Sequence, residues 1–154
     1  MKRSMTIFLT AALVACSKDA AGPAPASWAN GIWRASRMNG QPLPYRDAAT
    51  YPYLQMDSLL LFIFDPPLGG HAGDVFPSET LFFSATLTPT PILCWDDDLA
   101  VTVTAGGLTT HAKGAVTTGG GCNVSFAAFN LTRAGDSLVG TWNGATVAMV
   151  KGGP

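Results

Sequence analysis

The sequence predicts an all-β domain, most simply a small antiparallel up-and-down barrel of about eight strands. Gly or Pro interrupts nearly every window after Trp28, so a helical repeat of apolar residues is hard to find. Charged residues make up 12% of the 154 residues, about half the share of an average domain. The surface must rely on Thr, Ser, Asn and Gly, which suits strands better than helices. A β-sandwich is the alternative architecture.

Eight segments combine β-branched or aromatic residues with flanking turn residues. Leu99, Val101 and Val103 alternate with smaller or polar residues, which is typical of a strand with one buried face. Asn143-Gly144 favours a type I′ turn between the last two segments, and Asn39-Gly40 predicts a turn after the first. The predicted strands are residues 30–38, 57–64, 79–88, 99–104, 108–116, 122–132, 137–142 and 145–151.

Two segments depart from this pattern. Leu59–Phe64 is six apolar residues in a row, and such a strand needs cover on both faces. The cover could come from the Pro-rich segment Gln41–Tyr53, from a partner protein or from lipid. Residues 66–74 are rich in Pro and Gly, and we interpret them as an exposed loop that carries His71.

The first residues have the pattern of a secretory signal peptide. Lys2 and Arg3 form a basic start, and Met5–Val14 is a short, mostly apolar run that is followed by small residues. The run is too short to span a bilayer as a helix, which needs about 20 apolar residues. The sequence therefore predicts export of the remaining chain.

The end of this run, Leu13-Val14-Ala15-Cys16, resembles the lipobox of bacterial lipoproteins. The resemblance implies that residues 1–15 are a cleaved signal peptide and that the Cys16 thiol carries palmitate-type chains, which anchor the protein in a membrane. Ser17 follows where inner-membrane lipoproteins often carry Asp, which favours the outer membrane over the inner one. An ordinary cleaved signal that happens to contain Cys16 is the alternative.

The rest of the chain divides into a spacer and one domain. Residues 16–27 hold the acylated Cys and a linker rich in Ala and Pro, in which Pro23 and Pro25 favour an extended conformation. Residues 28–154 form the predicted β-barrel domain, which is long enough for one core of its own.

Charge and cysteine content limit the classes of partner. The formal net charge is −1, and loss of Lys2 and Arg3 with the signal makes the remainder more acidic. A nucleic-acid-binding protein needs a basic patch, so we expect no nucleic-acid partner. Cys94 and Cys122 are left after acylation, and in the oxidising cell envelope such a pair predicts a disulfide. Two separate buried thiols are the alternative.

Several motifs together resemble the lipocalins and related calycin barrels. Gly31-Ile32-Trp33 is similar to the motif that opens their first strand. The resemblance implies that Trp33 plugs the closed end of the barrel and that a late Arg, here Arg133, packs across it. The longer run Gly31–Tyr45 and the late run Gly140–Gly144 resemble parts of small lipocalin-like domains in bacterial lipoproteins. A second lipocalin motif of the Thr-Asp-Tyr kind does not occur in the sequence.

Catalytic residues are not predicted. A hydrolase needs a nucleophile, a base and an orienting group, and the sequence has no Gly-x-Ser-x-Gly elbow. His71 falls in the predicted loop, and His111 lies on a Thr-rich strand beside Lys113. We therefore expect a protein that is not an enzyme and that carries no cofactor. An enzyme would need two or more of His71, His111 and the Asp cluster at 96–98 to converge on one pocket.

A metal site is not predicted either. The two His are far apart in sequence, and the carboxylate cluster Asp96-Asp97-Asp98 lacks the alternate ligands and distal Glu of an EF-type calcium loop. We interpret the three Asp as a solvated turn. Calcium binding by Asp96, Asp97 and Asp98 is left open.

The aromatic residues carry the functional prediction. Eight-stranded barrels are wide enough to hold one small ligand or to be filled by their own side chains. The leading hypothesis is a non-enzymatic binding module for a small apolar ligand in the cell envelope. The alternative is a structural or protein-interaction lipoprotein with a filled barrel, in which Leu59–Phe64 docks an envelope partner. The candidate ligand-binding residues are Trp33, Phe62, Phe64, Phe83, Phe126 and Trp142.

Overall fold

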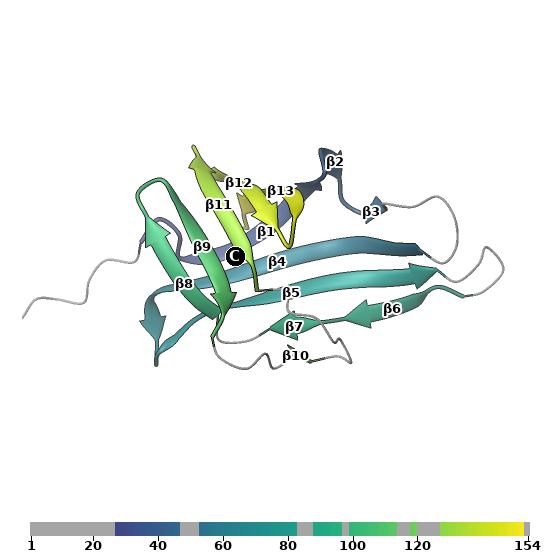
Figure 1. Ribbon diagram of the computed structural model, residues 1–154, viewed down its shortest axis with the longest axis horizontal. Helices are drawn as coiled ribbons and strands as arrows, with labels where there is room; N and C mark the ends of the chain where they lie inside the picture. The colour runs from purple at the N-terminus through teal and green to yellow at the C-terminus, as the bar shows by residue number, and fades with distance from the viewer. Residues whose placement is uncertain are drawn as a thin grey trace, which may run out of the picture.

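The protein forms one curled antiparallel β-sheet. The computed structural model describes residues 27–46, 53–82, 88–96, 99–113, 118–119 and 127–152. These residues contain no helix, and all of their strand pairs are antiparallel. The all-β prediction is confirmed, and a single continuous barrel-like sheet forms in place of the two sheets of a sandwich (Figure 1).

Eight strands make up the body of the sheet, and five short ones extend it. The order of the main strands across the sheet is β5-β4-β1-β13-β12-β11-β9-β8. The main strands are β1 (Gly31–Met38), β4 (Tyr53–Leu68), β5 (His71–Phe82), β8 (Leu99–Thr104), β9 (Gly107–Ala112), β11 (Phe129–Ala134), β12 (Ser137–Trp142) and β13 (Ala145–Lys151). The short strands are β2 (Gln41–Pro42), β3 (Tyr45–Arg46), β6 (Thr90–Leu93), β7 (Trp95–Asp96) and β10 (Thr118–Gly119).

The connectivity is that of an up-and-down barrel with one open seam. Successive main strands pair with each other, and the last strand, β13, returns to pair with β1. Only β5 and β8 break the sequence, since no strand pairing joins them within the described residues. These two strands still lie against each other, because a Cβ on Gly73 of β5 would stand 3.3 Å from the Val101 side chain of β8.

The predicted strand bounds agree closely at both ends of the domain. The segments 99–104, 137–142 and 145–151 are β8, β12 and β13, and the segment 30–38 is β1 with one residue fewer. The predicted strand 108–116 is observed as β9 from Gly107 to Ala112, and 122–132 is observed as β11 from Phe129 onward. Residues 83–87, 114–117 and 120–126, which complete the predicted strands, lie outside the described residues.

The interpretation of residues 66–74 as a loop was wrong. β4 continues to Leu68 and β5 begins at His71, so only Gly69-Gly70 form the turn between them. Both glycines have a positive φ, 61° and 89°, which a glycine adopts at little cost. Pro66 and Pro67 lie between Ile63 and Leu68, where the pairing of β4 with β5 changes register. They therefore interrupt no regular pairing.

The apolar run Leu59–Phe64 alternates in the structure, and the protein's own core covers only one of its faces. Leu59, Leu61 and Ile63 are 0% exposed and point into the core. The residues between them, Leu60, Phe62 and Phe64, are only half-buried on the outer face. β4 lies between β1 and β5 in the sheet, and only its inner face meets the core.

The two predicted Asn-Gly turns are confirmed. Asn143 and Gly144 have φ values of 45° and 87°, and Asn39 and Gly40 have values of 47° and 78°. Positive φ at both central residues is the geometry of a type I′ turn. The Asn39 side chain also accepts a hydrogen bond from the backbone N–H of Thr146, 3.0 Å away, which ties the first turn to β13.

Candidate functional site

The predicted ligand-binding aromatics do not share one face of the sheet. Trp33 is 2% exposed, and its indole Nε1 donates to the carbonyl of Ala29 at 2.7 Å. Trp142 is buried against Phe129, with ring centroids 6.1 Å apart. Phe62 and Phe64 lie on the opposite, outward face of β4. Phe83 and Phe126 lie outside the described residues.

The inside of the curled sheet is occupied by the protein's own side chains. They come from all eight main strands and form one continuous cluster. The two buried indoles are part of this cluster, so they fill space that an internal ligand would need. The fully buried large side chains include Leu59, Leu61, Ile63, Val75, Leu99, Leu138 and Met149.

Two indoles in edge-to-face contact and two cations gather at one end of the sheet. The Trp28 and Trp33 rings meet edge to face at 6.2 Å between centroids. The Arg133 guanidinium lies 4.9 Å from the Trp28 centroid, and Lys151 Nζ lies 5.5 Å from that of Trp33. The late Arg suggested by the lipocalin resemblance therefore covers Trp28, while Lys151 covers Trp33. An open cavity of about 480 Å³ lies over this group.

The seam between β5 and β8 holds a small cleft. Its volume is about 110 Å³, well below the roughly 300 Å³ at which ligand pockets for drug-sized molecules begin. Of the candidate ligand-binding residues that the structure describes, Phe64 lines it. The other lining residues are Asp65, Pro67, Ala72, Val101 and Val103.

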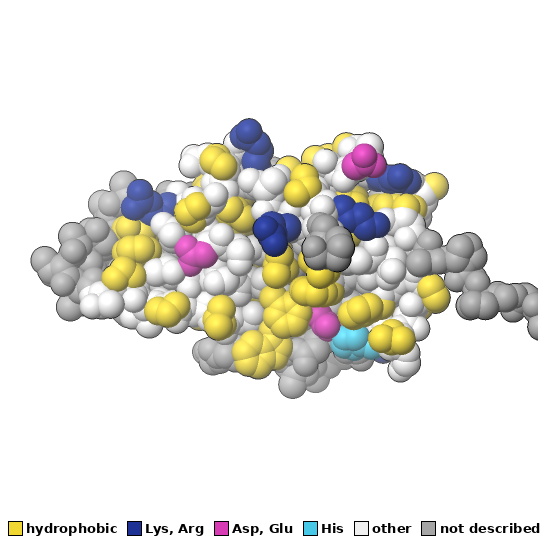
Figure 2. Space-filling view, turned by 180° about the vertical axis from the view of Figure 1, so that it is seen from behind, with side chains coloured by type: hydrophobic (Ala, Val, Ile, Leu, Met, Phe, Trp, Pro, Cys, Tyr) yellow, Lys and Arg dark blue, Asp and Glu magenta, His cyan; other side chains and the backbone are white. Residues whose placement is uncertain are grey.

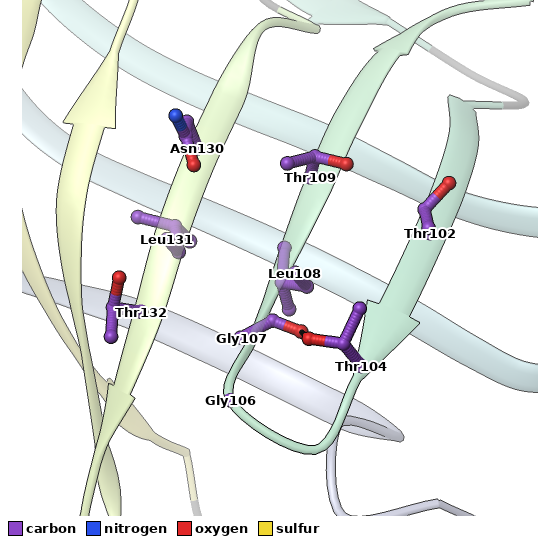
Figure 3. A pocket seen from close by; sticks show the side chains of 9 residues that line it. All are labelled: Thr102, Thr104, Gly106, Gly107, Leu108, Thr109, Asn130, Leu131 and Thr132. Atoms are coloured by element: carbon purple, nitrogen blue, oxygen red, sulfur yellow. Dashed lines mark hydrogen bonds between the residues drawn. The ribbon is translucent and has the colours of Figure 1, made fainter.

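A second hollow lies across the outer face of β8, β9 and β11. Thr102, Thr109 and Asn130 form a polar row over the three strands, and the hollow of about 210 Å³ lies beside it (Figure 3). Gly107 lines the hollow, and the Thr104 hydroxyl donates to the Gly107 carbonyl at 3.2 Å.

The outward face of β1, β4, β5 and β7 carries a continuous apolar patch, which we call the outer belt. Figure 2 shows hydrophobic side chains gathered in a band on this face, with Lys and Arg side chains near its border. Phe62 and Phe76 meet edge to face at 5.2 Å between ring centroids. We define the outer belt as Ile32, Leu60, Phe62, Phe64, Phe76 and Trp95.

Strand register brings the outer belt together from segments far apart in sequence. Ile32 pairs with Phe62, and Leu60 pairs with Phe76. Val75 pairs with Asp96, so the antiparallel register puts Trp95 beside Phe76 on the same face. Phe76 and Trp95 are each 38% exposed, and a contiguous exposed apolar patch is a sign of an interaction surface.

A groove with one available cation borders the outer belt. It has a volume of about 370 Å³ and lies between the outward side chains of β1 and β4. Arg34 is exposed, and within the described residues its guanidinium has no hydrogen bond or ion pair. The Asp57 carboxylate in the same groove already accepts hydrogen bonds from Gln55 and Thr80. The groove is lined by Arg34, Ala35, Ser36, Leu43, Asp57, Ser58 and Leu60.

The two histidines lie on different strands. His71 Nε2 and Asp74 Oδ1 are 2.7 Å apart on β5, and the His71 ring lies 5.4 Å from that of Phe64. His111 is exposed on β9, which is not a neighbour of β5 in the sheet. Of the Asp triplet, only the backbone of Asp96 is described. Among the residues that the structure describes, no three His, Cys, Asp or Glu side chains gather into a metal-binding group.

Glu79 is a titratable residue that the sequence did not single out. Its side chain is buried on the inner face of β5, opposite the buried Met56. Burial raises the pKa of the Glu79 carboxyl, and the negative charge of Asp57 raises it further. Glu79 belongs to no motif in the sequence, so only the register and the burial of β5 reveal this residue.

The predicted disulfide extends beyond the described residues. Cys94 is buried and is not a free thiol. Its backbone N–H donates to the Pro77 carbonyl at 3.3 Å, which holds it against β5. Cys122 lies outside the described residues, so the bridge between Cys94 and Cys122 stays a prediction.

Comparisons with protein-family models, with curated proteins and with solved structures found no match for this chain. Within the described residues, no helix has the length and apolar character that a membrane span requires. The resemblances of the N-terminal run and of Gly31–Tyr45 stay predictions, and the geometry of the sheet carries the functional argument.

Proposed function

We propose that this chain is a lipid-anchored protein of the bacterial cell envelope, attached through Cys16, whose filled barrel acts as a non-enzymatic interaction module. Its outer belt is the observation that carries the proposal, because exposed aromatic side chains stand together there while the interior is occupied. The basic start, the short apolar run and the residues up to Cys16 support export and anchoring, with the outer membrane as the expected destination.

The packing inside the sheet supports an interaction role over an internal ligand. Leu61, Trp33 and Trp142 occupy the space that a carrier protein would leave for its cargo. The four cavities described above are open to the surface, and the largest of them lies over the Trp28 end. The side chains available for binding a partner therefore lie on the outer surface of the domain.

Replacement of the anchoring cysteine tests the envelope proposal. We expect Cys16→Ser to lose incorporation of a labelled fatty acid and to leave the membrane fraction or accumulate as uncleaved precursor. Fatty-acid labelling and fractionation of cells that express the full chain measure this. Ser17→Ala is the matched control and should be labelled like the wild type. Fatty-acid labelling of Cys16→Ser would contradict the proposal.

A small apolar ligand is the second candidate, and the seam between β5 and β8 favours it. A barrel strand pair without hydrogen bonds can separate more easily than a paired one, and Val101 and Val103 line the cleft there. Native mass spectrometry of the full lipidated chain distinguishes the two candidates. A mass equal to that of the lipidated chain supports the filled barrel, whereas an additional mass that is lost on unfolding supports a ligand.

A further inference from the structure

We propose that the outer belt docks on the lipid surface that holds the Cys16 anchor, so that the domain lies on the membrane with the outward face of β1, β4, β5 and β7 against it. This inference rests on the proposed lipid anchor and adds to it a defined orientation of the domain. Three observations carry it: the chemistry of the belt, the point at which the tether leaves the domain, and the charges beside the belt.

The outer belt has the composition that favours a membrane interface. A row of neighbouring positions runs across the sheet from Val150 of β13 through Arg34 and Leu60 to Phe76. Trp95 extends the row on β7, and Val150 at its other end is also exposed. Tryptophan has an apolar ring and a polar N–H, and it concentrates at the boundary between lipid chains and head groups.

The tether leaves the domain beside the outer belt. The Ser27 N–H donates to the Asp65 carbonyl at 3.1 Å, and the Asp65 N–H donates to Asn30 Oδ1 at 3.2 Å. The first described residue is therefore fixed to the end of β4 that carries Phe64. Along β4, the five residue-to-residue steps from Asp65 to Leu60 cover roughly 17 Å.

The length of chain between anchor and domain allows the belt to reach the bilayer. The residues between Cys16 and Ser27 span at most about 35–40 Å when they are fully extended. This exceeds the distance from Asp65 to the centre of the belt, so the anchor and the belt can meet the same membrane surface. A tether of this length also keeps the domain at an effective concentration in the millimolar range, and weak apolar contacts then suffice for docking.

An exposed cation lies within the row. Arg34 is exposed, and within the described residues its guanidinium has no hydrogen bond or ion pair. The Asp57 carboxylate in the same groove accepts hydrogen bonds from Gln55 and Thr80 and not from Arg34. A guanidinium in this position fits the phosphate groups of anionic lipids.

Tryptophan quenching by lipids measures the orientation directly. The full lipidated chain is reconstituted at low density into vesicles of phosphatidylcholine and phosphatidylglycerol whose acyl chains carry bromine, which quenches nearby indoles. Trp33 and Trp142 are buried and Trp28 is half-buried, so the exposed indole of Trp95 should dominate the signal. We expect Trp95→Phe to lose more than half of the quenching. Phe76→Ser, which removes an apolar neighbour and keeps the reporter, should also reduce it.

A reporter elsewhere on the outer face of the sheet is the matched control. Val139 is 42% exposed on β12 and is not part of the outer belt. In the Trp95→Phe background, Val139→Trp should not restore the quenching. Arg34→Gln should lower the quenching of Trp95 in vesicles that contain phosphatidylglycerol and leave it unchanged in phosphatidylcholine alone.

Flotation of the same vesicles separates this proposal from the lipid anchor. Protein that does not float with the vesicles has no anchor, which overturns both proposals. If the protein floats but Trp95 is not quenched, the anchor stands and the docking proposal is overturned. The same holds if the Val139→Trp reporter is quenched as strongly as Trp95. Crosslinked dimers that form only at high density, without quenching at low density, would show that a second copy covers the belt, which also overturns it.

Discussion

Glu79 is the residue whose environment departs furthest from what its type implies. A carboxyl group is seldom buried, because water stabilises its charge far better than a protein interior does. On the inner face of β5, burial and the nearby Asp57 both raise the pKa of Glu79 above its ordinary value of 4.5. The folded protein therefore binds this proton more tightly than the unfolded chain.

The stability of the domain should depend on pH through Glu79. Below pH 4.5 the carboxyl is protonated in both states, and above it the unfolded chain gives up the proton first, which lowers stability as the pH rises. We expect Glu79→Gln to raise the free energy of unfolding at pH 7 and to have a much smaller effect below pH 4.5. Urea unfolding at pH 7 and at a pH below 4.5 measures this free energy. The Asp136→Asn variant, which changes an exposed carboxylate, is the control. An equal gain at both pH values would contradict it.

The tryptophan of the Gly31-Ile32-Trp33 motif lies in the aromatic group at one end of the sheet. The Gly31-Ile32-Trp33 motif predicts a tryptophan that plugs the sheet, and Trp33 is buried beneath Trp28 at that end. The partner of Trp33 could not be predicted, because Lys151 becomes its neighbour only when β13 pairs with β1. A single cation at such a site contributes about 0.5–1 kcal/mol.

Strand β11 shows how glycines shape an element. Gly107 of β9 and Gly140 of β12 flank it on both sides, and a Cβ at either position would overlap backbone atoms of β11. The neighbouring strands can therefore approach β11 closely, which permits the sharp curl of the sheet at this place.

A pair of glycine variants tests this account of the curl. Gly107→Ala forces a Cβ against the Leu131 backbone, so we expect a loss of about 2 kcal/mol or more in the free energy of unfolding. Gly106→Ala is the matched control, since open space surrounds that position, and its effect should stay within about 1 kcal/mol of zero. Chemical denaturation measures both, and equal losses would refute the steric explanation.

The β4–β5 hairpin explains why the outer belt could not be found from the sequence. Two irregularities shift its register, one at Asp57 and one between Ile63 and Leu68. Counting outward from the Gly69-Gly70 turn would pair the wrong residues, because each irregularity adds more residues to β4 than to β5. The partner of Leu60 is Phe76 as a result of the irregularity between Ile63 and Leu68.

At the scale of the molecule, the two faces of the sheet have different roles. The inner face is packed from every main strand, and the outer face carries the belt on one side and a polar Thr row on the other. A small barrel that is filled in this way gains its stability inside and is free to present binding residues outside. The proposed docking uses only outward side chains.

A comparison of two neighbouring leucines tests the division between the faces. Leu61 is fully buried and Leu60 is half-buried on the outer belt. We expect Leu61→Ala to cost about 2–5 kcal/mol of stability, because it leaves a cavity in the packed interior. Leu60→Ala should cost about 1 kcal/mol or less and should weaken membrane docking instead. Equal destabilisation by the two variants would show that both faces of β4 are core.

Much of the fold was predictable from local patterns. The all-β class, the bounds of β8, β12 and β13 and the two Asn-Gly turns follow from residues close together in the chain, because alternation and positive φ are local properties. The inward direction of Leu59, Leu61 and Ile63 was not predicted, since Leu59–Phe64 is apolar throughout and shows no period.

The sequence by itself determined the strand-forming segments, the turns between neighbouring strands and the residue types available for a site. Only the tertiary structure decided which side chains meet. Ile32, Phe62, Phe76 and Trp95 become neighbours through pairing across four strands and one register shift. The same pairing buries Trp33 and Trp142 and turns Phe62 and Phe64 outward. Register depends on turns, bulges and packing together, so contacts of this kind follow from the folded sheet and not from any one segment.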